Sequence, residues 1–384
     1  MARMLGYQGS TCCSLAQGAP YVSWLFNLPA SYGASASGLG MASAYYDNAE
    51  DGFSCSGCTQ WWNQLQSNPQ YIGRDCAGNM IGSPPTEETG DITQAGWQSV
   101  WQGVAASQDG SLTALFADGG GDPGAGSYPC GSSSSSYLAD LVAMFNGTNK
   151  PVIANNVFET SAIGTDWHTI DAAPNVIGAM ADSDCYVDAN AYGMGSADFA
   201  ITQSMHSYGY PVDDWTQREN DELYLASVGK QFWCLIGASG TASTETALRI
   251  YAYASLMLTF DLRTTGYFTY WKTDSVGQLE VYPETGLVPA NPVIGTPSSV
   301  TALQVGSVYA REYNDCFYRG TDEGRCAFVV NPASSTQNWP ALSRSYGHTM
   351  ALSGGGVLEG GSVSFTAAAP PAILFSGTAV VAFR

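Results

Sequence analysis

The chain repeats a run of apolar residues followed by a helical pattern, and this alternation constrains its fold more than any other feature. Apolar runs that we expect to form buried strands lie at residues 112–118, 151–156, 175–182, 231–236 and 266–271. Helical patterns lie at residues 91–107, 137–146, 197–208 and 244–260. Continuous apolar strands separated by helices are typical of a parallel sheet that is covered on its outer face. Further strand candidates at residues 5–8, 22–26 and 40–45 raise the count to that of a (β/α)8 barrel.

The character of the sequence changes after Pro297. Residues 298–384 contain glycine-rich turns and short strand patterns, the clearest of them at 327–332, 362–365 and 378–383. The segment 283–299 has four prolines and is expected to be a linker. We therefore predict an α/β fold: a (β/α)8 TIM-like barrel over residues 1–297, followed by a small all-β sandwich domain over residues 298–384. A Cys- and Trp-rich insertion near 46–90 is expected to be a long loop of the barrel.

The charge balance excludes two large classes of partner. The 384 residues include 13 Lys+Arg against 33 Asp+Glu, which gives a formal net charge of −20. Binding to nucleic acid or to an anionic membrane surface needs a basic surface, so neither is expected. No apolar run approaches the roughly 20 residues of a membrane-spanning helix, so membrane insertion is not expected either.

The ten cysteines indicate an oxidising compartment. Cys316 and Cys326 flank a charged loop and are expected to join a hairpin by a disulfide. Cys55-x-x-Cys58 with Cys76 could bind zinc, but no second pair and no histidine lies nearby, so we favour a disulfide there. We expect no metal and no cofactor. The chain starts without a signal-peptide pattern, which fits the mature form of a secreted or extracellular protein.

Carboxylates at the ends of predicted strands are the main chemical signal. Asp118 ends one apolar run and Asp122 follows it, while Asp182 ends another run with Asp184 close behind. Barrel enzymes place catalytic groups at the carboxyl ends of their strands, and glycoside hydrolysis needs a pair of carboxyl groups. An aromatic cleft would raise the pKa of the member that acts as the acid. The alternative is that these residues are turn and helix-cap aspartates, as Asp-Gly sequences often are.

Other polar and aromatic residues could complete a sugar site. Asn155, Asn156 and Glu159 lie at or just beyond the strand between the two aspartate pairs, where they could bind hydroxyl groups, or Glu159 could be the acid. Candidate substrate-binding residues elsewhere are Trp61, Trp62, Trp271 and Lys272. Aromatic rings pack against the CH faces of sugars, although any of these tryptophans could instead belong to the core. Trp97, Trp101 and Trp233 lie on apolar faces and are expected to be structural.

These patterns resemble glycoside-hydrolase-like proteins that have a (β/α)8 barrel and a C-terminal β-sandwich domain, with distant similarity to α-galactosidase-type and polygalactosaminidase-type barrels. The segments that carry the resemblance are Leu115–Gly120, Val176–Asp182, Tyr267–Trp271, Val308–Tyr313 and Val329–Pro332. The resemblance implies that Asp118 is the carboxylate of the fourth strand and Asp182 that of the sixth. Near the end of the sixth strand, where a Glu is expected, this sequence has Asp182 and Asp184.

The sequence therefore predicts a secreted glycoside hydrolase that binds a polysaccharide or oligosaccharide. Asp118 is the expected nucleophile or base, and Asp182, Asp184 or Glu159 is the expected acid. Two alternatives stay open: a non-catalytic carbohydrate-binding protein on the same fold, and a structural or filament-forming cell-surface protein. The low content of charged residues and the high glycine content would suit the second alternative.

Overall fold

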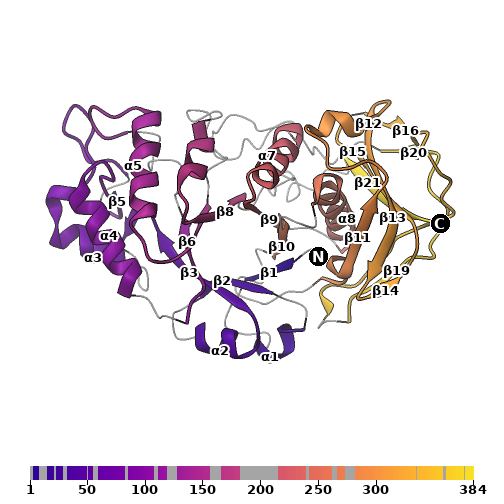
Figure 1. Ribbon diagram of the computed structural model, residues 1–384, viewed down its shortest axis with the longest axis horizontal. Helices are drawn as coiled ribbons and strands as arrows, with labels where there is room; N and C mark the ends of the chain where they lie inside the picture. Colours follow the sequence, from indigo (N-terminus) through magenta and orange to yellow (C-terminus); the bar gives the residue numbers. More distant parts are fainter. Residues whose placement is uncertain are drawn as a thin grey trace. The chain divides into compact units, whose positions relative to one another are not determined.

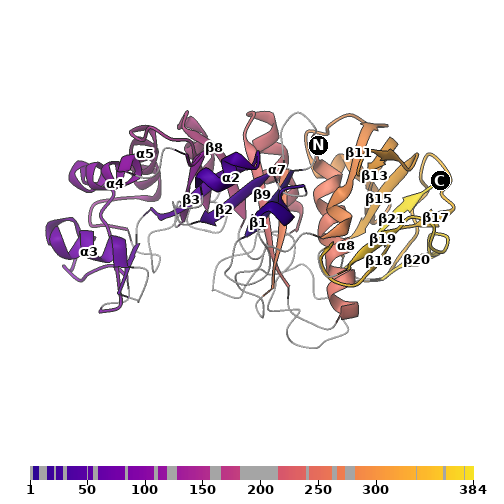
Figure 2. The same cartoon turned by 90° about the horizontal axis from the view of Figure 1, so that it is seen from below.

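The computed structural model describes residues 3–7, 15–20, 23–28, 33–49, 51–54, 59–82, 85–107, 111–118, 128–155, 166–181, 215–238, 242–261, 266–272, 282–333, 335–357, 360–375 and 377–384. They belong to two compact units, whose elements are drawn in Figures 1 and 2. The central unit comprises residues 24–181, and the terminal unit comprises residues 1–23 together with residues 182–384.

The central unit is built on a curled parallel sheet. Its strands are β2 (Trp24–Leu28), β3 (Ala42–Asn48), β6 (Ala114–Asp118), β7 (Val152–Asn155) and β8 (Val176–Ala181). They pair in the order β2-β3-β6-β7-β8, and every pair is parallel. Strands β6 and β7 are buried almost throughout, which is the burial expected of a parallel sheet covered on both faces.

Helices rich in aromatic residues accompany this sheet. They are α2 (Gly33–Gly38), α3 (Thr59–Ser67), α4 (Ala95–Ser107) and α5 (Ser134–Asn146), with 3-10 turns η2 (Pro69–Tyr71) and η4 (Asp166–Ala172). Figures 1 and 2 show α3, α4 and α5 grouped together. Trp97 and Trp101 on α4 are fully buried, as the sequence predicted. Trp101 also packs against Phe145 of α5, with 5.6 Å between their ring centroids.

The Cys- and Trp-rich segment 46–90 contains more regular structure than the predicted long loop. After β3 it forms β4 (Asp51–Phe53), helix α3 and β5 (Glu87–Thr89), and β4 pairs with β5 in an antiparallel ladder. Helix α3 forms because Trp61 and Leu65, one helical turn apart, are both buried. Cys76 forms a disulfide with Cys130, so it is not a partner of the Cys55-x-x-Cys58 pair, which lies outside the described residues.

The terminal unit contains a second parallel run. Its strands β1 (Arg3–Tyr7), β9 (Gln231–Ala238) and β10 (Gly266–Lys272) pair in the order β9-β10-β1. Its helices are α1 (Leu15–Gly18), α7 (Trp215–Ser227) and α8 (Ala242–Thr259). All eight strands predicted from the sequence are therefore present and parallel, five in the central unit and three here. The helix predicted at residues 197–208 lies outside the described residues.

The C-terminal part of this unit is an antiparallel sheet. Its main strands are β11 (Leu287–Pro292), β13 (Val308–Tyr318), β15 (Cys326–Asn331), β21 (Thr378–Phe383) and β17 (His348–Thr349), in that order. Short strands β12 (Gln304–Val305) and β14 (Thr321–Asp322) also pair with β13. Two small ladders join β16 (Gln337–Asn338) to β20 (Ile373–Leu374) and β18 (Ala351–Ser353) to β19 (Ser362–Ser364). The predicted disulfide between Cys316 and Cys326 is confirmed.

Helix α8 packs on one face of this antiparallel sheet, as Figures 1 and 2 both show. Ala327 and Val329 of β15 belong to an apolar cluster that also includes Leu374 of β20. Phe328 points the other way and meets Tyr313, whose hydroxyl donates to the Met257 carbonyl of α8 at 2.6 Å. Strand β15 is thus buried on both faces, which explains why its sequence is continuously apolar.

The proline-rich segment 283–299 is not the linker that the sequence predicted. It forms the 3-10 turn η6 (Pro283–Gly286) and strand β11, and a further 3-10 turn, η7 (Val300–Leu303), follows it. Pro289 and Pro292 lie on β11, which is at the edge of the antiparallel sheet. An edge strand tolerates proline because one of its sides needs no N–H donor.

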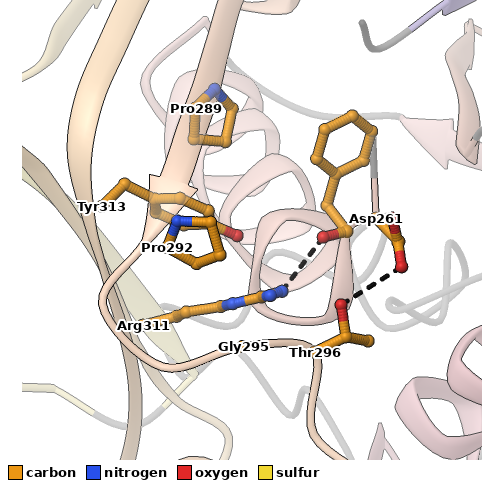
Figure 3. Close-up of a pocket in the computed structure, with 8 residues that line it drawn as sticks. Asp261, Pro289, Pro292, Gly295, Thr296, Arg311 and Tyr313 are labelled. Atoms are coloured by element: carbon orange, nitrogen blue, oxygen red, sulfur yellow. Dashed lines mark hydrogen bonds between the residues drawn. The ribbon is translucent and has the colours of Figure 1, made fainter. Parts of the chain in front are cut away.

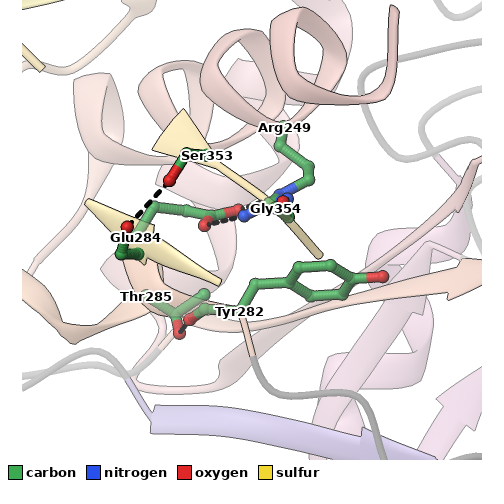
Figure 4. Close-up of polar contacts among 7 residues, drawn as sticks. Arg249, Tyr282, Glu284, Thr285, Ser353 and Gly354 are labelled. Atoms are coloured by element: carbon green, nitrogen blue, oxygen red, sulfur yellow. Dashed lines mark hydrogen bonds and ion pairs between the residues drawn. The ribbon is translucent and has the colours of Figure 1, made fainter. Parts of the chain in front are cut away.

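A buried ion pair ties α8 to the turn η6. Figure 4 shows Arg249 of α8 reaching Glu284, and both side chains are fully buried. The Arg249 Nε donates to Glu284 Oε1 at 2.8 Å and its Nη2 donates to Glu284 Oε2 at 2.6 Å. The Nη1 donates to the Gly354 carbonyl at 2.9 Å, and the guanidinium lies 4.4 Å from the centre of the Tyr282 ring. This two-pronged geometry is the strong form of an Arg–carboxylate pair.

Two buried carboxyl groups of α7 converge on one hydroxyl group of α8. The Thr259 Oγ1 lies 3.0 Å from Glu219 Oε2 and 2.5 Å from Glu222 Oε2. Burial raises the pKa of Glu219 well above its usual range and the neighbouring Glu222 raises it further, while Thr259 and Arg311 act in the opposite direction. Glu219 therefore holds its proton more tightly in the folded protein than in the unfolded chain.

The raised pKa predicts a stability that falls with increasing pH. Stability from Glu219 is fully present below the ordinary Glu value of 4.5 and is lost as the pH rises through the higher folded-state pKa. We expect the urea midpoint to fall as the pH rises from 4.5 through the higher folded-state pKa, and Glu219→Gln, which imitates the protonated acid, to flatten that fall. The partly exposed Glu323→Gln is the control and should leave the slope unchanged. If the urea midpoint falls equally steeply with pH in the wild type and in Glu219→Gln, the raised pKa does not belong to Glu219.

None of the described helices is long and apolar enough to cross a membrane.

Candidate active site at the strand ends of the central unit

Three neighbouring strands of the central sheet end in a polar residue at the same level. Strand β3 ends at Asn48, β6 at Asp118 and β7 at Asn155. Asn48 is in register with Asp118, and the register between β6 and β7 runs through the preceding Ala117 and Ala154. Residues in register on parallel strands project from the same face. The carboxyl edge of this sheet therefore has a row of one carboxyl and two amide side chains.

Asp118 and Asn155, both selected from the sequence, are in direct contact. The Asn155 Nδ2 donates to Asp118 Oδ1 at 2.7 Å, and the Asn155 side chain is fully buried. The carbonyl oxygen of Asp118 accepts from the backbone N–H of Ala49 at 2.7 Å, which ties the end of β6 to the chain that leaves β3. The carboxylate is thus held in a fixed direction by the neighbouring strand, while Asp118 itself is only half-buried. A carboxylate that is oriented but still accessible is suited to act as a nucleophile or base.

Asn48 belongs to the same row and was not selected from the sequence. Its side chain is buried, and its carbonyl oxygen accepts from the Trp101 Nε1 at 2.9 Å, so α4 holds the end of β3. The predicted strand 40–45 stops three residues before β3 ends. With the correct end, the same rule that selected Asp118 and Asn155 would have selected Asn48.

Asp47 lies one residue earlier on β3 and therefore faces the opposite side of the sheet from Asp118. It is only 1% exposed. Burial raises the pKa of Asp47 well above its usual range, and the polar group of the nearby Trp61 offsets part of that effect. Asp47 consequently stays protonated to a higher pH than an ordinary aspartate, on the face that carries the tryptophan cluster.

The two predicted tryptophan platforms of α3 differ in exposure. Trp61 is 6% exposed and packs against Trp97 and Trp101, with ring centroids 5.7 Å and 6.5 Å apart. This packing buries nearly all of the Trp61 surface in the core, so little of the ring is left to contact a ligand. Trp62 is half-buried, so part of its ring is open to a ligand.

The structure gives less information on the remaining candidate site residues. Trp271 and Lys272 are the last two residues of β10 in the terminal unit, in register with Gly237 and Ala238 of β9. Asp182 follows directly after Ala181, the last residue of β8. The candidates that lie outside the described residues are Asp122, Asn156, Glu159, Asp182 and Asp184. Within the described part of the chain, no cluster of three His, Cys, Asp or Glu side chains could hold a metal ion.

No protein-family sequence model matches the chain, and no curated protein matches it in sequence. Solved structures that resemble it include glycoside hydrolases, the class that the sequence resemblance named. The glycoside hydrolase domain of PelA from Pseudomonas aeruginosa has a TM-score of 0.39 and 11% identity, over 65% of this chain and 89% of that one. Ega3 of Aspergillus fumigatus, in complex with galactosamine, has a TM-score of 0.42 and 10% identity, over 73% and 94%. A debranching enzyme of Nostoc punctiforme has a TM-score of 0.44 and 10% identity, over 96% and 87%. These likenesses are distant.

Proposed function

We propose that this protein is a glycoside hydrolase that cleaves a polysaccharide or oligosaccharide with a pair of carboxyl groups. The observation that carries the proposal is the Asp118 carboxylate, which ends a buried parallel strand and is oriented by the fully buried Asn155 amide at 2.7 Å. Asp118 acts as nucleophile or base. Asn155 is its positioning residue, because its buried amide donates to the carboxylate and fixes its direction.

The second carboxyl group comes from Asp182, Asp184 or Glu159. Asp182 is the first choice because in the sequence it directly follows Ala181, the last residue of β8, and Met180 of this strand is in register with Asn155. A carboxyl group there would lie on the same edge of the sheet as Asp118, which is where parallel-strand enzymes gather their catalytic groups. Asp122, Asn156, Trp62, Trp271 and Lys272 are the proposed substrate contacts. The reaction needs no cofactor, since both proton transfers run through carboxyl groups.

The wider architecture in this proposal is the one predicted from the sequence. The (β/α)8 barrel that the sequence predicts stays part of this proposal, because a closed barrel leaves no strand edge open. The division into a catalytic barrel over residues 1–297 and a β-sandwich over 298–384 stays a prediction. Strand β11, which lies before residue 297, already pairs with β13 of the C-terminal sheet. Secretion also belongs to the proposal, and the disulfides support it.

A hydrolysis screen tests the function directly. The purified protein is incubated at about pH 4–7 with a panel of neutral and amino-sugar polysaccharides, and products are identified by mass spectrometry. Oligosaccharide products from any member support the proposal. A folded protein that binds a polysaccharide tightly but releases no product would favour the non-catalytic carbohydrate-binding alternative, and regular filaments in electron micrographs would favour the structural one.

Asn155→Asp gives a second, sharper expectation. It replaces the donated N–H by a carboxyl group within hydrogen-bond distance of Asp118, and two such groups share one proton at acidic pH. We expect the acidic limb of the kcat/KM profile to move to higher pH by on the order of one to two units. Asn155→Ala removes the donor without adding an acid, so its rate should fall with no shift of the limb. An unshifted limb in Asn155→Asp would argue against a catalytic role for Asp118.

A further inference from the structure

The small pocket beside Arg311 in the terminal unit is a feature of the packing rather than a binding site. Figure 3 shows Arg311, Asp261 and Thr296 around it. The Arg311 Nη1 donates to the carbonyl groups of Leu258 and Phe260, and the Thr296 Oγ1 donates to Asp261 Oδ2. Arg311 is 2% exposed and Phe260 is 3% exposed, so a ligand cannot reach either of them.

An open surface of the same unit lies on the ladder of β16 and β20, which Figure 1 shows side by side. Leu374 of β20 points inward and belongs to the apolar cluster beneath the ladder. Ile373 and Phe375, on either side of it in the chain, therefore point outward, and they are 41% and 64% exposed. Phe375 is the most exposed large apolar side chain in the described part of the protein. Single exposed apolar residues are ordinary, but two of them on one face form a patch.

A buried amide fixes the backbone under this face. The Asn331 Nδ2 donates to the carbonyl oxygens of Ser335 and Phe375 at 2.9 Å each, so the segment before β16 lies next to the end of β20. Asn331 is fully buried, which shields these bonds from water. The Thr378 Oγ1 also donates to the Phe375 carbonyl, at 2.8 Å. The exposed ring of Phe375 thus stands on a fixed backbone, which lowers the entropy cost of binding a ligand.

Two exposed polar side chains lie beside the two apolar ones. Asn338 of β16 is in register with Ile373 of β20. Thr336 directly follows the residue that Asn331 ties to Phe375, so it lies next to the end of β20. Both Asn338 and Thr336 are exposed, and neither side chain forms a hydrogen bond with another residue of the described part of the chain. An open ring therefore has an amide and a hydroxyl group beside it, each able to donate and to accept.

The segments that form this face are uncharged. Residues 326–343 and 360–383, which include both strands and their flanks, contain no Asp, Glu, Lys, Arg or His, in a chain of formal net charge −20. Two copies of so acidic a chain repel each other, and two apolar side chains expose far less than the roughly 1,000 Å² that a stable protein interface buries. Neither objection applies to a neutral polysaccharide. Its sugar rings have CH faces that can pack on an aromatic ring and hydroxyl groups that can bind an amide or another hydroxyl group.

We propose that the Phe375 patch, made of Thr336, Asn338, Ile373 and Phe375, is an accessory binding surface for a neutral polysaccharide. One sugar ring stacks its CH face on Phe375, the polymer continues across Ile373, and its hydroxyl groups form hydrogen bonds with Asn338 and Thr336. The patch belongs to the terminal unit and Asp118 to the central unit, so binding here does not use the Asp118 carboxylate. Binding at the patch therefore stands or falls separately from glycosidase activity.

Affinity electrophoresis of the full chain tests the binding. The native gels contain laminarin, hydroxyethyl cellulose, galactomannan or pullulan as neutral probes, or polygalacturonate as the anionic counterpart. Wild type and Asp118→Asn run side by side, the second because it is not expected to degrade the probe. We expect at least one neutral polysaccharide to slow the migration of both proteins. No retardation by any neutral polysaccharide, or retardation by polygalacturonate alone, would overturn the proposal.

Phe375→Ala locates the binding at the patch. It removes the stacking ring, so the apparent Kd from gels of increasing polysaccharide concentration should rise at least about fivefold. The ring is 64% exposed, so its loss leaves no cavity and the urea midpoint should stay that of the wild type. Phe375→Trp keeps an aromatic face and should bind at least as tightly as the wild type.

Ile294→Ala is the matched control, because Ile294 is an apolar residue of the same unit that is 57% exposed and lies outside the patch. It should leave the apparent Kd unchanged. An equal Kd in wild type and Phe375→Ala would place the polysaccharide elsewhere and overturn the proposal. Size-exclusion chromatography covers the other occupant: a dimeric wild type with a monomeric Phe375→Ala would assign the patch to a second copy of the chain instead.

Discussion

Asp118→Asn is expected to lower hydrolysis by at least about 10³-fold while leaving the protein as stable as wild type. The amide can neither attack a sugar carbon nor take a proton, so the transition state loses about 4 kcal/mol or more of stabilisation. The fold is spared because the amide oxygen of the substituted side chain can still accept from the Asn155 Nδ2, in the place of the 2.7 Å bond of the wild type. The measurement is kcat/KM on the best substrate of the screen, with urea unfolding in parallel.

Asp140→Asn is the matched control for this prediction. Asp140 lies on α5 in the same central unit, is partly exposed, and is not at a strand end. It should keep full activity. An Asp118→Asn protein that retains activity within about tenfold of wild type would remove Asp118 from the site, because a general base or nucleophile contributes far more than that. NMR of the first product of the wild type separates the two roles, since retention indicates a nucleophile and inversion a base.

The eight parallel strands could be predicted because each is a continuous apolar run, a pattern that few other structures share. The strand ends were less predictable. The predicted strand 40–45 stops at Tyr45, yet β3 continues through Asp47 and Asn48, because both polar side chains are buried and the Trp101 Nε1 donates to the Asn48 carbonyl. Tertiary packing thus extends a strand beyond its local pattern, and one member of the polar row was missed for that reason.

Helix α7 shows more clearly that local sequence pattern alone does not predict every element. Its sequence is polar, with no apolar stripe from which to predict a helix, yet Arg218, Glu219, Asp221 and Glu222 are all buried. The ion pair of Arg218 with Asp221 and the hydrogen bonds of Thr259 accommodate these charges in the folded state. Hydrophobic periodicity cannot reveal a helix whose buried face is charged.

Part of the candidate site could be predicted from the sequence. The rule that barrel enzymes place polar groups at strand ends selected Asp118 and Asn155 independently. That the amide of one holds the carboxylate of the other depends on the register of β6 against β7, which the sequence does not contain. The pocket beside Arg311 could not be predicted, because its walls come from segments that are far apart in the chain.

The ion pair between Arg249 and Glu284 carries the largest expected effect on stability. Arg249→Met should lower the free energy of unfolding by about 3–5 kcal/mol, because it leaves the Glu284 carboxylate fully buried without its cation. Glu284→Met should cost a similar amount for the converse reason. The measurements are the urea midpoint and hydrogen exchange in peptides of α8 and of the loop at Gly354, whose carbonyl loses the Arg249 Nη1.

The double variant Arg249→Met/Glu284→Met distinguishes a broken charge pair from simple loss of packing. A buried ion pair contributes little net stability over an apolar pair of similar volume, since its attraction mainly repays the cost of removing both charges from water. We therefore expect the double variant to be more stable than either single variant, with a coupling energy of about 3 kcal/mol. Additive losses, with the double variant the least stable of the three, would mean that the side chains act through packing and the Tyr282 contact. In that case packing would hold α8 against η6, and the charges of Arg249 and Glu284 would not be needed for stability.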